Sequence, residues 1–131
     1  QPLMEALFLS NINPEITYLQ VGSLYDFVLA QFNAAVDSVE VYDKKYMNDW
    51  SKEMMQTVKK LTEKELDYRY FITDYKYKEK KHDTPHTFIG WSPSYYKCEQ
   101  DGTPLYEWIA QNIIKDEPSN VGSQFLQLAI D

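Results

Sequence analysis

The longest apolar stretch of the chain, residues 23–42, most constrains the fold. Its apolar side chains recur at three- and four-residue steps, the spacing of an amphipathic helix: Leu24, Val28, Phe32, Ala35, Val39 and Tyr42. Polar side chains share a narrow stripe on the opposite side: Asp26, Asn33, Asp37 and Glu40. Ser23 followed by Asp26 has the spacing of a capping box. The pattern predicts one helix over 23–42, beginning at Ser23 and forming the internal spine of the domain.

Two further elements have clear periodicity. Residues 49–61 place Trp50, Met54, Val58 and Leu61 on one helical face and charged side chains on the other, so they predict a second amphipathic helix. The side chains of residues 66–77 alternate with a two-residue period, and most of these residues favour β structure, which predicts one long bent strand or two short ones. The alternation slips at Asp74, as it does at a bulge or a bend.

Turn residues divide the remainder of the chain. We expect strands over 86–91 and 95–98, joined by a turn at Ser92-Pro93-Ser94 and closed by Gln100-Asp101-Gly102. Thr103 as N-cap and Pro104 at the first helical position predict a helix that ends near Pro118. Residues 2–9 suit two helical turns, 15–21 a strand or a helix, and 124–130 a terminal strand or docking turn.

These elements predict an α+β fold in a single domain, residues 1–131. In this arrangement two or three N-terminal helices precede a small antiparallel β-meander. A C-terminal helix then packs on the sheet.

Charge is distributed unevenly along the chain, whose net charge is −7. Residues 1–43 contain six acids and no Lys or Arg, 44–81 contain eleven cations and seven acids, and 82–131 contain two cations and seven acids. Two explanations fit this distribution. The basic segment 44–81 packs against the acidic segments on either side of it, or the charged residues form a surface that binds a partner.

The residues with catalytic or metal-binding potential form no complete set. His82, Asp83, His86 and Cys98 are zinc ligand types, but their spacing matches no closed zinc framework. Cys98 lies between a lysine and a glutamate in a predicted strand, which is no activating environment for a thiolate. Neither nucleotide-binding glycine motif occurs. We therefore predict no catalytic residues, no cofactor and no metal, and favour a protein that is not an enzyme.

Other partners are weighed by charge and hydropathy. Residues 75–81 interleave tyrosines with lysines, as single-strand nucleic-acid platforms do, but a pI near 4.8 argues against nucleic acid. No apolar run approaches the eighteen residues of a membrane span. One cysteine excludes an internal disulfide and favours the cytoplasm.

The preferred function is therefore a small acidic protein-interaction module of the immunity, antitoxin or inhibitor type, which binds and occludes a partner protein with a basic face. Acidic balance steers a protein toward such a partner, and the eleven tyrosines supply contact area at low entropic cost. The candidate contact residues are acids of the first helix and aromatics around the predicted turn: Asp26, Asp37, Glu40, Trp91, Tyr95 and Tyr96.

Two alternatives remain. The order of elements resembles the nuclear-transport-factor-like cone folds, in which a long N-terminal helix precedes a curved sheet. That resemblance implies a small-molecule-binding protein or enzyme with Tyr68, Tyr70, Trp91 and His86 lining a cavity. The second alternative is a subunit or excised domain of a larger assembly, whose broad apolar arc around Phe27 and Leu29 is covered by a neighbour.

Overall fold

A pair of parallel strands forms the centre of the molecule. The computed structural model describes residues 13, 15–38, 44–64, 66–76, 88 and 92–129. Strand β1 (Thr17–Ser23) pairs with β2 (Asp67–Thr73) in continuous register, from Thr17 opposite Asp67 to Ser23 opposite Thr73. Val121 adds a parallel bridge to Phe71. Strand β2 is therefore the middle of the sheet and β1 is an edge.

The predicted antiparallel β-meander is wrong for this sheet. Two helices, α2 (Phe27–Asp37) and α3 (Lys44–Thr62), connect β1 to β2. A connection of that length allows the chain to cross over and enter the sheet again in the same direction, which a short hairpin loop does not. Within the described residues, antiparallel pairing is confined to a hairpin of β3 (Glu99–Gln100) and β4 (Thr103–Pro104).

The turn of this hairpin agrees with its sequence. Asp101 and Gly102 have φ values of 53° and 78°, the left-handed conformation that a two-residue hairpin turn of type I′ requires. The Gln100-Asp101-Gly102 turn is thus confirmed.

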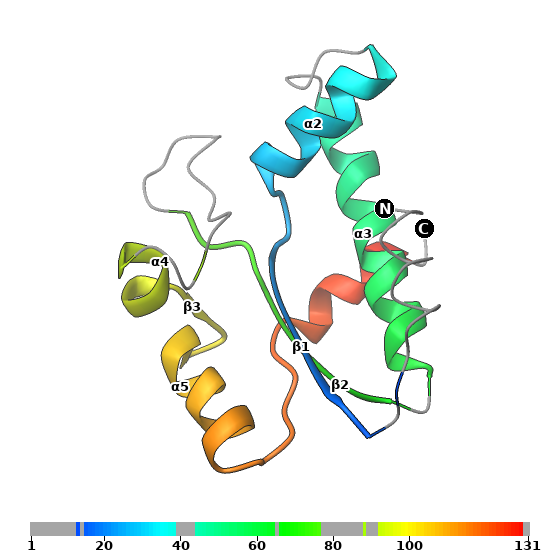
Figure 1. The fold of residues 1–131 in the computed structure, drawn as a ribbon. Coiled ribbons are helices and arrows are strands. Elements are labelled where there is room, and N and C mark those ends of the chain that lie inside the picture. The colour runs from blue at the N-terminus through cyan, green and yellow to red at the C-terminus, as the bar shows by residue number, and fades with distance from the viewer. Residues whose placement is uncertain are drawn as a thin grey trace.

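Helices cover both faces of the sheet (Figure 1), which places a hydrophobic cluster on each side. On one face lie α3 and the 3-10 helix η2 (Ser123–Ala129), which pack against Tyr68, Tyr70 and Ile72 of β2. On the other face Phe71 contacts Trp108, with ring centroids 5.7 Å apart. The alternation predicted for β2 is confirmed, and the strand ends at Thr73, directly before the predicted slip.

The second face is covered by the C-terminal half of the chain. It contains α4 (Ser92–Lys97), α5 (Leu105–Ile109) and a π-helical turn, η1 (Ala110–Ile114). Leu105 and Trp108 are fully buried there, and the Trp108 ring packs against Phe71 of β2. The α-helix predicted to end near Pro118 ends at Ile109 and continues as η1 to Ile114, so this prediction is confirmed only in part.

Helix α2 is shorter than predicted and begins later. Ser23 is the last residue of β1, because the Leu24 amide donates to the Thr73 carbonyl (2.7 Å) and keeps this segment extended. Asp26 is the N-cap, and its carboxylate accepts from the Leu29 amide at 2.9 Å. Ser38 ends the helix in the left-handed conformation, with φ 57°.

The prediction that this apolar rod is the internal spine is also wrong. Among the side chains of α2 that the structure describes, the buried ones are the small residues Ala30 and Ala34, while Phe32 is 68% exposed and Val36 84% exposed. The helix with the broad buried face is α3, which begins at Lys44, five residues earlier than predicted. Its apolar side includes Trp50 and Val58 and meets both β2 and η2.

Two further boundaries differ from expectation. Residues 92–97 form α4 rather than a turn and a strand, and Pro104 is the N-cap of α5 rather than its first helical residue. The first shift follows from Pro93, which fits an N-terminal helical turn as well as a β-turn. Of the predicted strand 86–91 only Phe88 is described, and residues 2–9 lie outside the described residues.

We predict that Gly122 is the least replaceable of the three glycines that the structure describes, Gly22, Gly102 and Gly122. Its φ is 89°, and a Cβ there would overlap the carbonyl oxygen of Ile72. Gly122→Ala is expected to lower the free energy of unfolding by about 3 kcal/mol, through backbone strain and displacement of β2. Gly102→Ala is the control, because φ is 78° there but the Cβ position is open, and about 1 kcal/mol is expected. Urea unfolding followed by tryptophan fluorescence measures both, and equal losses would contradict the role of the Ile72 contact.

Candidate protein-binding surface

An apolar stripe lies on the outer side of α2. Leu29, Phe32 and Val36 are 41%, 68% and 84% exposed, and their spacing places them on one helical face. We call these three residues the α2 stripe. Helix α2 leaves them outside because its alanine face already packs against the hydrophobic cluster around α3. Contiguous exposed apolar side chains of this kind mark contact sites.

An acidic groove adjoins the stripe where α2 meets the first turns of α3. Its volume is about 300 Å³, and Val36 belongs to both the stripe and the groove. The residues that line it are Asn33, Val36, Asp37, Tyr46, Asp49, Trp50 and Glu53. Asp49 and Glu53 are four residues apart on α3, so their carboxylates share a face and meet Asp37 from α2. The groove therefore offers three carboxylates and two aromatic side chains.

Contacts inside the groove hold its acids in place. The Tyr46 hydroxyl donates to Asp37 Oδ2 at 3.1 Å, and the pKa of Tyr46 is raised, first by burial and then by Asp37 and Glu53. Lys45 pairs with Asp49 at 2.8 Å, but both side chains are more than half exposed. An exposed pair of this kind is worth less than about 1 kcal/mol, so a partner's cation displaces it at little cost.

The predicted contact residues fall into three groups. Asp37 lines the groove, whereas Asp26 is 5% exposed and serves as the cap of α2. Tyr95 is half-buried and Tyr96 is 65% exposed, both on α4. Glu40 and Trp91 lie outside the described residues. The structure thus brings Asp37 together with α3 side chains and leaves the two tyrosines at a separate place.

Tyr95 and Tyr96 form an aromatic cluster with Tyr106 of α5. Their rings stand edge to face with centroids 5.0 Å apart, and Tyr106 lies 6.4 Å and 6.2 Å from them. Tyrosine packs an apolar ring and leaves its hydroxyl to solvent, so this cluster also stabilises the junction of α4 and α5. The sequence did not predict that Tyr106 joins this cluster, because it lies ten residues or more after Tyr95 and Tyr96.

Sequence reasoning also missed Tyr46, Asp49 and Glu53 as a group. The signal was present, because Asp49 and Glu53 have helical i, i+4 spacing, but the predicted helix began at residue 49 and excluded the turn that carries Tyr46.

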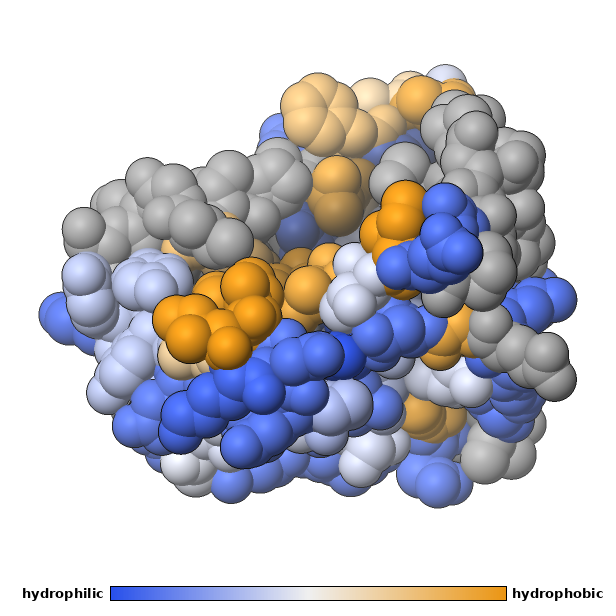
Figure 2. Space-filling view, turned by 60° about the horizontal axis from the view of Figure 1, so that its bottom comes forward, coloured by the Kyte–Doolittle hydropathy of each residue, from blue (hydrophilic) through white to orange (hydrophobic). Residues whose placement is uncertain are grey.

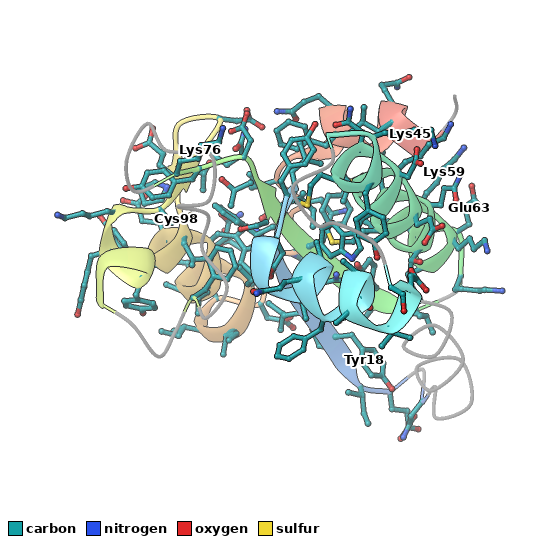
Figure 3. All side chains as sticks on the ribbon, turned by 90° about the horizontal axis from the view of Figure 1, so that it is seen from above. Tyr18, Lys45, Lys59, Glu63, Lys76 and Cys98 are labelled. Atoms are coloured by element: carbon teal, nitrogen blue, oxygen red, sulfur yellow. The ribbon has the colours of Figure 1, made fainter. Side chains whose placement is uncertain are left out.

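Residues with catalytic potential are not assembled in the described part. Cys98 is fully buried, and burial raises its pKa to about 11, so the thiol is neutral at physiological pH. In Figure 3 it lies among α4, β3 and α5, across the sheet from Lys59. His82, Asp83 and His86 are outside the described residues, and among those described no three His, Cys, Asp or Glu side chains converge on a metal position.

Polar groups inside the sheet have structural partners. Arg69 is 4% exposed, donates to Asp67, Asp116 and the Asn112 carbonyl, and lowers the pKa of Asp67 chiefly through their hydrogen bond. Tyr68 donates to Gln20 Oε1 at 2.5 Å, and burial raises its pKa. Tyr68 and Tyr70 pack in the α3-side core. The cavity that the cone-fold resemblance implies also needs His86 and Trp91, which are not described, so it stays a prediction.

Comparison with known proteins adds no further constraint. No protein-family model matches the chain, and no curated protein or solved structure matches it either. Among the described helices, none has the length and apolar character needed to cross a bilayer.

We predict that Cys98 is chemically inert in the folded protein. Because its pKa is raised to about 11 and no part of its side chain is exposed, a disulfide reagent at pH 8 should react on the timescale of unfolding. The measurement is the rate of thiol labelling with and without 6 M urea. Burst labelling of the native protein would contradict the buried, neutral thiol.

Proposed function

We propose that this chain is a protein-interaction module that binds a basic partner through the α2 stripe and the acidic groove and occludes it. The observation that carries the proposal is the contact between these two features at Val36, where an exposed apolar face continues into three carboxylates. Immunity, antitoxin and inhibitor proteins act in this way, by covering a surface rather than by chemistry.

The stripe supplies the affinity in this proposal. Phe32 is the largest side chain of the α2 stripe, and covering it on binding removes its ring from water. A helix with anchors at three- and four-residue spacing fits an apolar groove on a partner.

The acidic groove supplies orientation and steering. In this proposal a lysine or arginine of the partner, bound beside the α2 stripe, pairs with Asp37, Asp49 or Glu53. The aliphatic part of its side chain packs along Tyr46 and Trp50. Residues 15–38 carry no Lys or Arg, so no cation of β1 or α2 opposes such a partner.

A subunit of a larger assembly is the second candidate. The same exposed stripe favours it, because a permanent neighbour covers apolar surface of this kind. The two candidates differ in the lifetime of the complex. An occluding module exists free and binds reversibly, whereas a subunit co-elutes with its neighbour at every dilution.

The proposal is tested by photo-cross-linking in the organism that encodes the chain. A benzophenone amino acid at position 32 is expected to capture a defined protein, while the same group at Gln127, an exposed residue of η2, captures none. Dilution of the recovered complex then separates an occluding module from a subunit. Equal products from the two positions would contradict the proposed surface.

We predict that two substitutions weaken this complex without unfolding the chain. Phe32→Ser should raise Kd by about tenfold to a hundredfold, and Glu53→Lys by about tenfold with a loss of salt dependence. Both side chains are exposed, so the free energy of unfolding should change by less than about 0.5 kcal/mol.

The matched control is Glu63→Lys, which makes the same charge change beyond the C-terminal end of α3 (Figure 3). It should leave Kd within about twofold in titrations of the recovered partner. A loss of affinity at Glu63 equal to that at Glu53 would assign the effect to net charge and contradict a role for the groove.

A further inference from the structure

The outer edge of β1 is a second feature that the proposed function does not use. Within the described residues the sheet ends at β1, which runs for seven residues. The opposite edge is far shorter, because Val121 contributes a single bridge. Figure 1 looks onto this edge, with β1 crossing in front of β2.

The hydrogen-bond pattern identifies which main-chain groups face outward. The Leu24 amide donates to the Thr73 carbonyl, and Ser23 is opposite Thr73. In a parallel ladder every second residue turns its N–H and C=O to the same neighbour, so Gln20 and Gly22 face β2. The N–H and C=O groups of Leu19 and Val21 therefore point to the outer edge.

The sequence of this edge has none of the usual protections. Natural edge strands carry lysine, proline, a bulge or an inward charge that prevents pairing with another chain. Strand β1 reads Thr-Tyr-Leu-Gln-Val-Gly-Ser, with no charged residue and no proline, and its register with β2 is unbroken. A long, regular and uncharged edge is a template for an added strand.

Apolar side chains flank the edge. Leu19 and Val21 are half-buried against the cluster around Trp108. Arg69, the register partner of Leu19, donates to the Asn112 carbonyl, which places η1 over this part of the sheet. Ile113 and Ile114 of η1 are 60% and 81% exposed. Figure 2 shows apolar atoms on both sides of a hollow in the face that it presents.

Charge selects the occupant of this edge. At the start of β1 the carboxylates of Glu15, Asp67 and Asp116 lie in exposed or partly exposed positions, and Arg69 is already shared by the latter two. The β1 strand of a second copy carries no Lys or Arg that could pair with these acids. A segment bearing Lys or Arg instead gains from them.

We propose that the outer edge of β1 binds an extended, lysine- or arginine-bearing segment of another protein, which adds to the sheet as a further strand. Main-chain hydrogen bonds to Leu19 and Val21 hold the segment, and its alternate apolar side chains contact the flanking apolar groups. This site is separate from the α2 stripe and does not depend on the function proposed for it.

Amide hydrogen exchange of the ¹⁵N-labelled chain tests the proposal. In the free protein Leu19 and Val21 should exchange quickly, while Gln20 and Gly22 are protected by β2. The probe is the peptide acetyl-Lys-Val-Thr-Val-Lys-Val-Thr-Lys-amide at about 1 mM, which should slow exchange at Leu19 and Val21 by about tenfold or more and leave Gln20 and Gly22 unchanged. A peptide with glutamate in place of each lysine should have little effect.

Substitutions test whether the peptide protects Leu19 and Val21 by binding to the edge of β1. Leu19→Lys places a gatekeeper on the edge and should abolish the protection, while Gln127→Lys, with the same added charge on η2, should preserve it. Phe32→Ser should also preserve it, which separates this site from the α2 stripe.

Four results would overturn the proposal: slow exchange of Leu19 and Val21 in the free protein, protection that rises with protein concentration and so comes from a second copy, no protection by the lysine peptide, or equal protection by the glutamate peptide.

Discussion

The parallel pairing of β1 with β2 is the constraint on which the rest of the structure depends. A parallel strand pair needs a long connection and buries both faces of its middle strand. Six of the seven residues of β2 are buried, so helices must cover it on each side. Helix α3 with η2 takes one face, and α5 takes the other.

This arrangement also decides which surfaces remain for binding. Because α3 occupies the face of the sheet, α2 packs beside it through Ala30 and Ala34 and leaves the side chains of the α2 stripe outside. The crossing of α2 and α3 then forms the acidic groove. The proposed binding surface is thus a consequence of how the connection between the two parallel strands is folded.

Local patterns predicted the structure correctly where a periodic stretch ran over many residues or where a turn required residues with positive φ. The face of α3, the alternation of β2 and the Asp101-Gly102 turn follow from 3.6-residue periodicity, two-residue periodicity and positive φ. The first residue of a helix was harder to predict. Ser23 and Asp26 can both cap the N-terminus of α2, and Asp26 does so because the hydrogen bond from the Leu24 amide to the Thr73 carbonyl keeps Ser23 in β1. In the candidate site, Asp37 was predicted, whereas Tyr46 and Glu53 were not.

The sequence by itself determined the amphipathic character of α3, the two-faced β2 strand and the absence of Lys and Arg before residue 44, because these are properties of neighbouring residues. Tertiary structure alone decided that β1 and β2 are parallel, that Phe32 faces outward and that Asp37 meets Glu53. Each of these depends on which apolar helix faces pack against the one small sheet, whose area is limited. The segments that could pack there are distant in sequence, so a pattern of neighbouring residues does not predict which of them does.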